Sequence, residues 1–134
     1  MPRNVKWFAW LWAVSCLMLI PEVLLMPEPG PNALKAGFTR PMYMAVTAGF
    51  AILLLLITLP FFWLAVWKRK NWARWLLFVV TIGTLPLLFT PHAFEPNFLP
   101  MTSVAFVGAM FGIAAFYFVF TGDARPWFSS KNSN

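Results

Sequence analysis

Three long stretches without a charged residue constrain this chain more than any other feature of its sequence. They cover residues 41–67, 75–94 and 96–122. A helix that crosses the hydrocarbon core of a bilayer, which is roughly 30 Å thick, needs about 20 consecutive apolar residues. Each stretch is therefore long enough for one crossing. We expect transmembrane helices over about residues 43–67, 75–91 and 101–121.

A fourth span is expected near the N-terminus, where one acidic residue interrupts the apolar sequence. The uncharged run of residues 7–21 is short, but four apolar residues follow Glu22 and extend the stretch to about residues 6–26. Basic residues before an apolar run are also typical of a cleaved signal peptide. A retained span is favoured because three tryptophans lie in the run and no small-x-small cleavage site follows it.

The overall composition indicates lipid as the solvent. The 134 residues are 60% hydrophobic and only 10% charged, whereas a soluble domain averages about 25% charged residues. With one cysteine, Cys16, and one histidine, His92, a single chain can form neither an intramolecular disulfide nor a zinc site of the Cys/His type. We therefore expect one all-α domain over residues 1–134, a bundle of four transmembrane helices without metal or cofactor.

The distribution of charge predicts the orientation of these spans. Eight of the ten Lys and Arg residues fall on one side of a four-span topology, and short loops rich in such residues stay in the cytoplasm. The eight tryptophans lie near the same side, where Trp rings favour the headgroup region. We expect an up-down-up-down bundle in a bacterial inner membrane, with both termini in the cytoplasm. The eight basic residues are Arg3, Lys6, Lys68, Arg69, Lys70, Arg74, Arg125 and Lys131.

Part of this basic side is expected to contact the membrane surface. Anionic headgroups attract clustered Lys and Arg side chains, which accounts for the net charge of +6 without a nucleic-acid partner. Asp123 is expected to pair with Arg74 or Arg125. The residues expected to bind headgroups are Lys68, Arg69, Lys70 and Arg74. The expected interfacial anchors are Trp72, Arg74, Trp75, Arg125 and Trp127.

Small residues spaced four apart mark two helix faces. Gly108 and Gly112 form a small-xxx-small pattern that Ala105 and Ala115 extend, and such stripes let two helix backbones approach closely. A shorter stripe in the second span is the expected partner within the bundle. The longer stripe can equally dock another subunit, and both interpretations stay open. The shorter stripe consists of Ala45 and Gly49.

Three ionisable residues are candidates for an ion or proton site. An acidic residue within a span is a functional candidate by default, although Glu22 is explained more simply as an interfacial glutamate at a helix end. His92 and Glu95 are three residues apart and would share one face of a helical turn. A solvated loop explains that pair more simply.

Two prolines fall inside the expected spans. Pro60 and Pro86 each remove one backbone hydrogen bond, so we expect a kink at each position. The hydroxyls of Thr58 and Thr81 are expected to help satisfy the carbonyls that the prolines free.

Two short motifs resemble a group of bacterial proteins. Residues 71–77 read Asn-Trp-Ala-Arg-Trp-Leu-Leu, and residues 123–128 read Asp-Ala-Arg-Pro-Trp-Phe. Together they resemble small four-span inner-membrane proteins of uncharacterised function, which often carry such a turn and such a tail. The resemblance implies the topology of the whole chain and supplies no catalytic residue.

Missing motifs narrow the function further. The middles of the last three spans carry no ionisable residue, and neither Gly-x-Ser-x-Gly nor His-Glu-x-x-His is present. We expect a non-enzymatic protein that acts by helix–helix association, as an accessory subunit of a larger membrane complex or as a membrane immunity or regulatory protein. The alternative is a small homo-oligomeric transporter or channel that uses Glu22. A third hypothesis is an enzyme that acts on lipid headgroups through His92 and Glu95.

Overall fold

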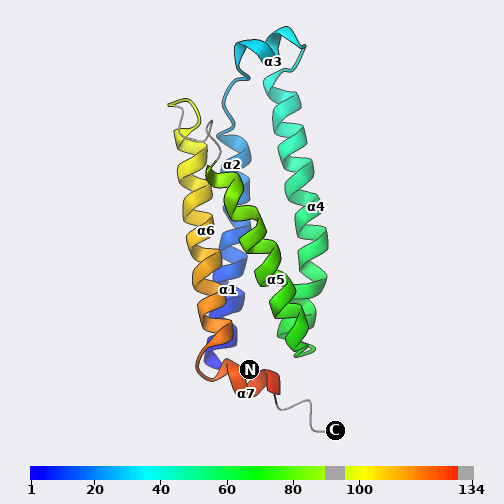
Figure 1. Cartoon of the computed structure of the whole chain (residues 1–134), viewed down its shortest axis with the longest axis vertical. Helices are drawn as coiled ribbons and strands as arrows, with labels where there is room; N and C mark the ends of the chain where they lie inside the picture. Colours follow the sequence, from blue (N-terminus) through cyan, green and yellow to red (C-terminus); the bar gives the residue numbers. More distant parts are fainter. Residues whose placement is uncertain (90–95, 130–134) are drawn as a thin grey trace.

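The computed structural model describes residues 1–89 and 96–129, and every regular element in this part of the chain is a helix (Figure 1). The all-helical class expected from the sequence is therefore confirmed. The elements are α1 (Arg3–Leu17), α2 (Leu19–Leu24), α3 (Pro31–Lys35), α4 (Arg40–Val66), α5 (Asn71–Thr84), the 3₁₀ helix η1 (Leu85–Phe89), α6 (Leu99–Phe120) and α7 (Ala124–Ser129).

Three helices in the described ranges are long and apolar enough to cross a membrane. They are α4, α6 and the rod formed by α1 and α2, over Arg40–Val66, Leu99–Phe120 and Arg3–Leu24. These helices cover three of the four expected spans, with ends that differ by a few residues. The break between α1 and α2 lies at Met18, three residues before Pro21. Pro21 has no N–H to donate to the preceding turn, so the hydrogen-bond ladder is interrupted there.

The expected third span is divided into two kinds of helix. The α-helix α5 ends at Thr84, and the chain continues as η1 around Pro86. At Pro60, by contrast, α4 continues without interruption as an α-helix. Thr58 Oγ1 donates to the carbonyl of Leu54 at 2.8 Å, whereas the carbonyl that Pro60 frees belongs to Leu56. The prediction that the Thr58 hydroxyl satisfies the carbonyl freed by Pro60 is therefore wrong.

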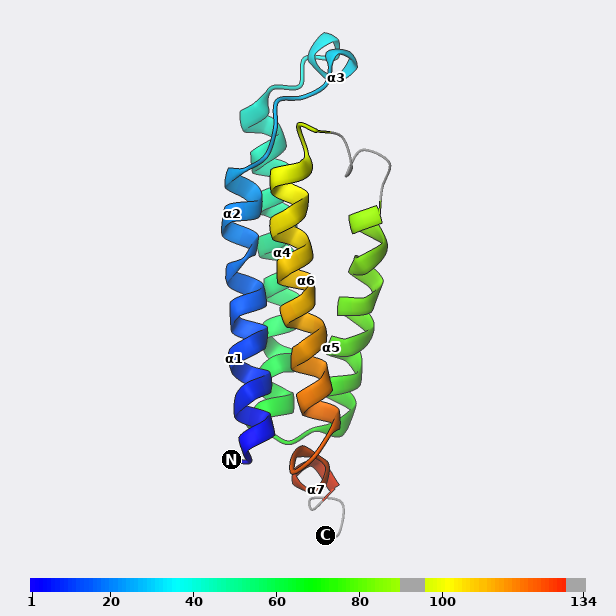
Figure 2. The same ribbon diagram turned by 90° about the vertical axis from the view of Figure 1, so that its left-hand side faces the viewer.

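The helices form two antiparallel pairs that lie side by side (Figures 1 and 2). One pair is α1–α2 with α6, and the other is α4 with α5. We call the end of the bundle that holds the N-terminus and α7 the inner end, and the end that holds α3 the outer end. The short helix α7 lies across the inner end, and α3 belongs to the connection between α2 and α4 at the outer end.

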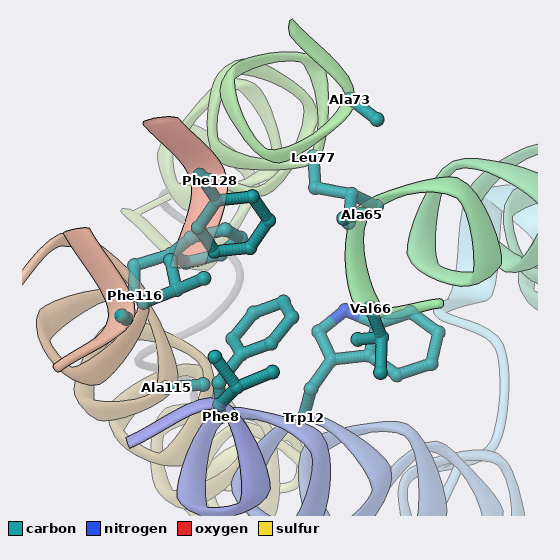
Figure 3. Packing of buried hydrophobic residues seen from close by; sticks show 12 residues of the cluster. Phe8, Trp12, Ala65, Val66, Ala73, Leu77, Ala115, Phe116 and Phe128 are labelled. Carbon is teal, nitrogen blue, oxygen red and sulfur yellow. The ribbon is translucent and has the colours of Figure 1, made fainter. Parts of the chain in front are cut away.

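The hydrophobic core is concentrated toward the inner end, and Figure 3 shows how its side chains pack together. Phe8 and Trp12 of α1 pack on aromatic side chains of α4 and α6, with ring centroids 4.2 Å apart for Trp12 and Phe62 and 5.8 Å apart for Phe8 and Phe116. Phe128 of α7 is fully buried in the same cluster. In contrast, α2 has no buried residue. The tight packing at the inner end thus leaves the outer half of the bundle more open.

Candidate functional site

A cavity of about 200 Å³ lies in the outer half of the bundle, between both helix pairs. Its walls come from α1, α2, α4, α5, η1 and α6, so the site needs the whole bundle. Most of the wall is apolar, but polar side chains from four helices line it. They are Ser15, Glu22, Thr47, Thr81 and Thr84. We call this space the Glu22 cavity.

Among the residues that the structure describes, Glu22 is the one carboxylate that lines this cavity, and it is half-buried on α2. Pro21 lies in the first turn of α2, where a missing N–H is tolerated, so the chain resumes a helix directly after the break at Met18. In the described ranges Glu22 takes part in no ion pair; the pair found there joins Arg40 to Glu28 at 3.7 Å. A carboxylate without a cationic partner is therefore placed in a mostly apolar cavity.

Arg40, a basic side chain at the outer end, is engaged in other contacts. Its Nε donates to the carbonyl of Met26 at 2.9 Å, and a second nitrogen lies 3.5 Å from the carbonyl of Leu24. These carbonyls lie at and just after the end of α2, where backbone acceptors lack helical partners. Arg40 thus joins the start of α4 to the end of α2, and within the described ranges it forms no ion pair with Glu22.

The hydroxyls of the cavity differ in their hydrogen bonds. Ser15 Oγ donates to the carbonyl of Gly108 at 2.8 Å, which joins α1 to α6. Thr84 Oγ1 donates to the carbonyl of Thr81 at 2.8 Å, within its own helix. A hydroxyl that donates to a backbone carbonyl still has lone pairs that can accept. The cavity can therefore offer oxygen atoms from a carboxylate and from several hydroxyls.

The small-residue stripe of α6 packs against α1. A Cβ added at Gly108 would lie 3.1 Å from Met18 Cβ, and one added at Gly112 would lie 3.3 Å from Ser15 Oγ. Ala115 is buried on the same helix, and Ala105 lines the Glu22 cavity. The glycines therefore serve the close approach of α1 and α6.

The expected pairing of this stripe with the second span is wrong. Ala45 is exposed on α4, and a Cβ added at Gly49 would have no neighbour within 4 Å. The stripe pattern predicts how closely a helix can be approached but does not determine which neighbour approaches it. In this bundle α1 occupies the face of α6 that Ala45 and Gly49 were expected to cover.

An apolar groove of about 590 Å³ runs between the α1–α2 rod and α4. It extends from Trp12 near the core to Leu24 at the outer end. Three residues line both this apolar groove and the Glu22 cavity, so the two spaces adjoin. The shared residues are Leu19, Val23 and Ala51.

The inner end holds a second set of polar residues, which satisfy helix ends. The last carbonyls of an α-helix have no partner in the helix. Arg74 donates to the carbonyl of Val119 at 3.2 Å, Arg125 to that of Phe120 at 2.9 Å, and Asn4 to that of Thr121 at 2.9 Å. These three donors come from different helices or connections and secure the end of α6.

Asp123 satisfies backbone donors at the N-terminal end of α1. Its carboxylate accepts the backbone N–H groups of Arg3 at 2.8 Å and Asn4 at 3.0 Å, at the start of α1. The expected pair with Arg74 or Arg125 is not formed, because both guanidinium groups are turned to the carbonyls of α6. A carboxylate at a helix N-terminus also interacts favourably with the helix dipole.

The expected interfacial anchors fall into two groups. Trp72 and Trp75 are exposed, as a headgroup contact requires. Trp127 is half-buried and stacks with Arg69, whose Cζ lies 3.6 Å from the ring centroid. Arg74 Cζ lies 4.7 Å from the ring of Phe128. The aromatic side chains of α7 therefore bind arginines of this chain.

Two of the expected site residues, His92 and Glu95, lie outside the described residues. Within residues 1–89 and 96–129 no group of three His, Cys, Asp or Glu side chains is placed to hold a metal ion. Sequence reasoning did not find the hydroxyls that converge on Glu22. Two apolar helices supply three of them: α4 carries Thr47, and α5 carries Thr81 and Thr84. A polar residue within an apolar run was the sequence signal that could have identified each of these hydroxyls.

Comparisons with protein-family models, with curated proteins and with solved structures found no match to this chain.

Proposed function

We propose that this chain is a small membrane transporter or channel that binds a cation at Glu22. The observation that carries the proposal is a half-buried carboxylate without an ion pair in the described ranges, in a cavity that all the long helices build. Ionisable side chains within a membrane are costly to place and usually mark an ion or substrate pathway. The apolar helices around the cavity make this reasoning applicable here.

We also propose that four segments cross the membrane. The 14 residues of α5 and the five of η1 together reach about 31 Å, at about 1.5 Å per α-helical and 2.0 Å per 3₁₀ residue. This length matches a hydrocarbon core of roughly 30 Å. With α5 and η1 as the third span, both termini lie on one side, which the excess of Lys and Arg at the inner end identifies as cytoplasmic. A bacterial inner membrane fits this arrangement, with anionic headgroups at Lys68, Arg69, Lys70 and Arg74.

Transport requires more than a closed cavity in one chain. The Glu22 cavity of about 200 Å³ is lined at the outer half only, so ions need either a conformational change or a second copy to cross. We propose a homo-oligomer for this reason, since four helices rarely enclose a complete pore.

Replacement of Glu22 by Gln tests the proposed function. Purified protein in liposomes is assayed for flux of H⁺, Na⁺, K⁺ and alkylammonium ions, and binding of each is measured in parallel. The wild type is expected to bind and move at least one of them, and Glu22→Gln is expected to abolish that flux because the neutral amide cannot balance the charge. Glu28→Gln removes an exposed outer carboxylate and serves as the control, with flux retained.

Two results would overturn this proposal. One is a wild type that binds and moves none of these cations. The other is a Glu22→Gln protein with the flux and binding of the wild type.

Partner binding is the second candidate function, and it is favoured by the face of α4 that points away from the bundle. Ala45 and Gly49 are unoccupied small residues on an exposed helix face, where a helix of another subunit could approach closely. This candidate includes an accessory subunit of a membrane complex and a membrane immunity or regulatory protein.

A bulky residue on that face tests partner binding. Native mass spectrometry after mild extraction is expected to detect an assembly that Gly49→Leu weakens. Gly83→Leu is the control, because Gly83 of α5 also has open space around it. A monomer in every preparation, or an assembly that both variants leave intact, would count against α4 as the interface.

A further inference from the structure

The arrangement of the Glu22 cavity and the apolar groove restricts what kind of cation can bind. The two spaces adjoin at Leu19, Val23 and Ala51, between α2 and α4. Their volumes, about 200 and 590 Å³, lie in or near the range of roughly 300–1,000 Å³ typical of small-molecule sites. A monatomic ion would occupy only a small part of this space.

The groove is unsuited to a hydrated ion. Apart from the thiol of Cys16, its lining side chains carry no polar group other than the indole N–H of Trp12. A bare charge without hydrogen-bonding partners is strongly disfavoured in such surroundings. An apolar molecular body, in contrast, leaves no polar group unpaired there and packs against the lining side chains.

The cavity is also a poor site for a metal ion. Calcium takes six to eight oxygen ligands, usually with several carboxylates, and magnesium prefers octahedral oxygen ligands. Among the described residues, Glu22 is the only carboxylate in the lining, and hydroxyls supply the remaining side-chain oxygens. One carboxylate with neutral hydroxyls matches a single positive charge on an organic group instead.

The groove opens away from the bundle. Leu17 and Ile20 on the rod and Ile52 and Leu59 on α4 line it and are exposed. In the proposed topology these side chains face the acyl chains of the bilayer. A ligand dissolved in the membrane can therefore reach the groove sideways, without crossing the closed inner core.

We propose that the occupant is an amphipathic organic ammonium ion with one positive charge. Its apolar body lies in the groove between the rod and α4, and its cationic group lies beside Glu22. The groove extends from Trp12 to Leu24 on the rod, or about 18 Å at 1.5 Å per residue. This inference rests on the proposed function and specifies the substrate class of the same site.

Equilibrium binding to the full chain in phosphatidylcholine nanodiscs tests the inference, with empty nanodiscs to subtract partitioning into lipid. The probes are octyltrimethylammonium, tetramethylammonium, Na⁺, K⁺ and a neutral octyl ether of similar size. Octyltrimethylammonium is expected to bind the wild type at least about tenfold more tightly than either the neutral ether or tetramethylammonium, because only it can contact Glu22 with its charge and pack its chain in the groove at the same time.

Two kinds of variant separate the contributions. Glu22→Gln is expected to weaken octyltrimethylammonium binding about tenfold or more, and Glu22→Asp to retain part of it. Ala51→Phe fills the junction of groove and cavity and is expected to weaken the same binding. Ala45→Phe is the matched control, because Ala45 lies on the same helix, is exposed and lines neither space. Thermal unfolding of each variant verifies that the bundle is intact, and if Ala51→Phe does not fold, Ala48→Leu replaces it in the groove.

The outcomes distinguish this inference from the proposed function. Equal binding of tetramethylammonium, or of Na⁺ or K⁺, that needs Glu22 but is unaffected by Ala51→Phe overturns the inference and leaves the cation site standing. Neutral ether that binds as tightly as the ammonium, with no effect of Glu22→Gln, means that the groove only holds an acyl chain and overturns the inference, whereas the cation site is decided separately by the binding and flux of H⁺, Na⁺ and K⁺ in the Glu22→Gln protein.

Discussion

Among individual residues, the polar side chains at the inner end satisfy helix termini that are far apart in sequence. Asp123 accepts the N–H groups of Arg3 and Asn4, 120 and 119 residues away, while Asn4 donates to Thr121. The start of α1 and the end of α6 thereby satisfy each other. Gly122, with φ +57°, allows the chain to leave α6 and bring Asp123 to this position.

Removal of the Asp123 carboxylate should destabilise this junction. Asp123→Ala is expected to lower the free energy of unfolding by about 1 kcal/mol, since two backbone N–H groups at the start of α1 lose their acceptor and the helix dipole loses a favourable charge. Denaturation in mixed micelles measures the change.

The control for this prediction is Glu28→Gln. It removes a carboxylate whose partner, Arg40, lies 3.7 Å away at an exposed position, and such exposed pairs contribute only about 0–1 kcal/mol. If Asp123→Ala unfolds at the same denaturant concentration as the wild type, the carboxylate does not stabilise the helix start.

The sequence was informative about some single residues and uninformative about others. Capping signals are read from residues next to a helix end, so a cap supplied by Asp123 to a helix more than 100 residues away cannot be recognised. Charge alone favours a pairing of Asp123 with Arg74 or Arg125. The backbone carbonyls of α6 compete for those guanidinium groups, and charge patterns contain no information about that competition.

At the level of helices, runs of apolar residues predicted which segments form long helices better than which helices pack against each other. The runs predicted the long helices because length and hydropathy are local properties. They did not predict the end of α5 at Thr84, although Pro86 marks the position where the backbone loses a donor. They also could not predict which face of α6 meets α1, because α6 is apolar on all sides and no stripe distinguishes a buried face from a lipid-facing one.

Alanine substitutions at two glycines, one in the contact between α1 and α6 and one outside it, are expected to change the stability of the bundle in opposite directions. Gly108→Ala places a methyl group 3.1 Å from Met18 Cβ, tighter than an ordinary carbon contact, and is expected to destabilise the bundle by about 1–3 kcal/mol through overpacking. Gly83→Ala meets nothing within 4 Å and is expected to be neutral or to stabilise by up to about 1 kcal/mol through helix propensity.

Thermal unfolding of the two alanine variants in one detergent measures this difference. The shared substitution removes the effect of helix propensity from the comparison, so the sign reports on packing alone. Equal melting temperatures for Gly108→Ala and Gly83→Ala would show that α1 and α6 are not closely packed at Gly108.

In the molecule as a whole, the contacts that stabilise the bundle and the proposed binding site lie toward different ends. The inner half contains the aromatic core and the mutual capping of α1 and α6, whereas the outer half contains the cavity, the groove and the helix breaks at Met18 and Thr84. The convergence of Ser15, Thr47, Thr81 and Thr84 depends on how three helices are rotated about their axes. Hydropathy does not determine that rotation, which is why this site could not be predicted from the sequence while the number of long apolar segments could.

The proposed four-span topology is tested by single cysteines in a Cys16→Ser background. Lys35 and Asn97 flank the spans on the expected outer side, and Lys6 and Lys70 on the expected inner side; these four side chains are exposed. A membrane-impermeant maleimide added to intact cells is expected to label cysteines at the first two positions, and to label those at the other two only after permeabilisation. Asn97 is the decisive position, because it follows α5 and η1.

If α5 and η1 do not cross the bilayer, a cysteine at Asn97 stays on the same side as one at Lys70, and the C-terminus then lies opposite the N-terminus. In that arrangement α6 could not run antiparallel to α1, and the mutual capping of their ends would be lost, so labelling of position 97 only after permeabilisation would contradict both the topology and the contacts at the inner end.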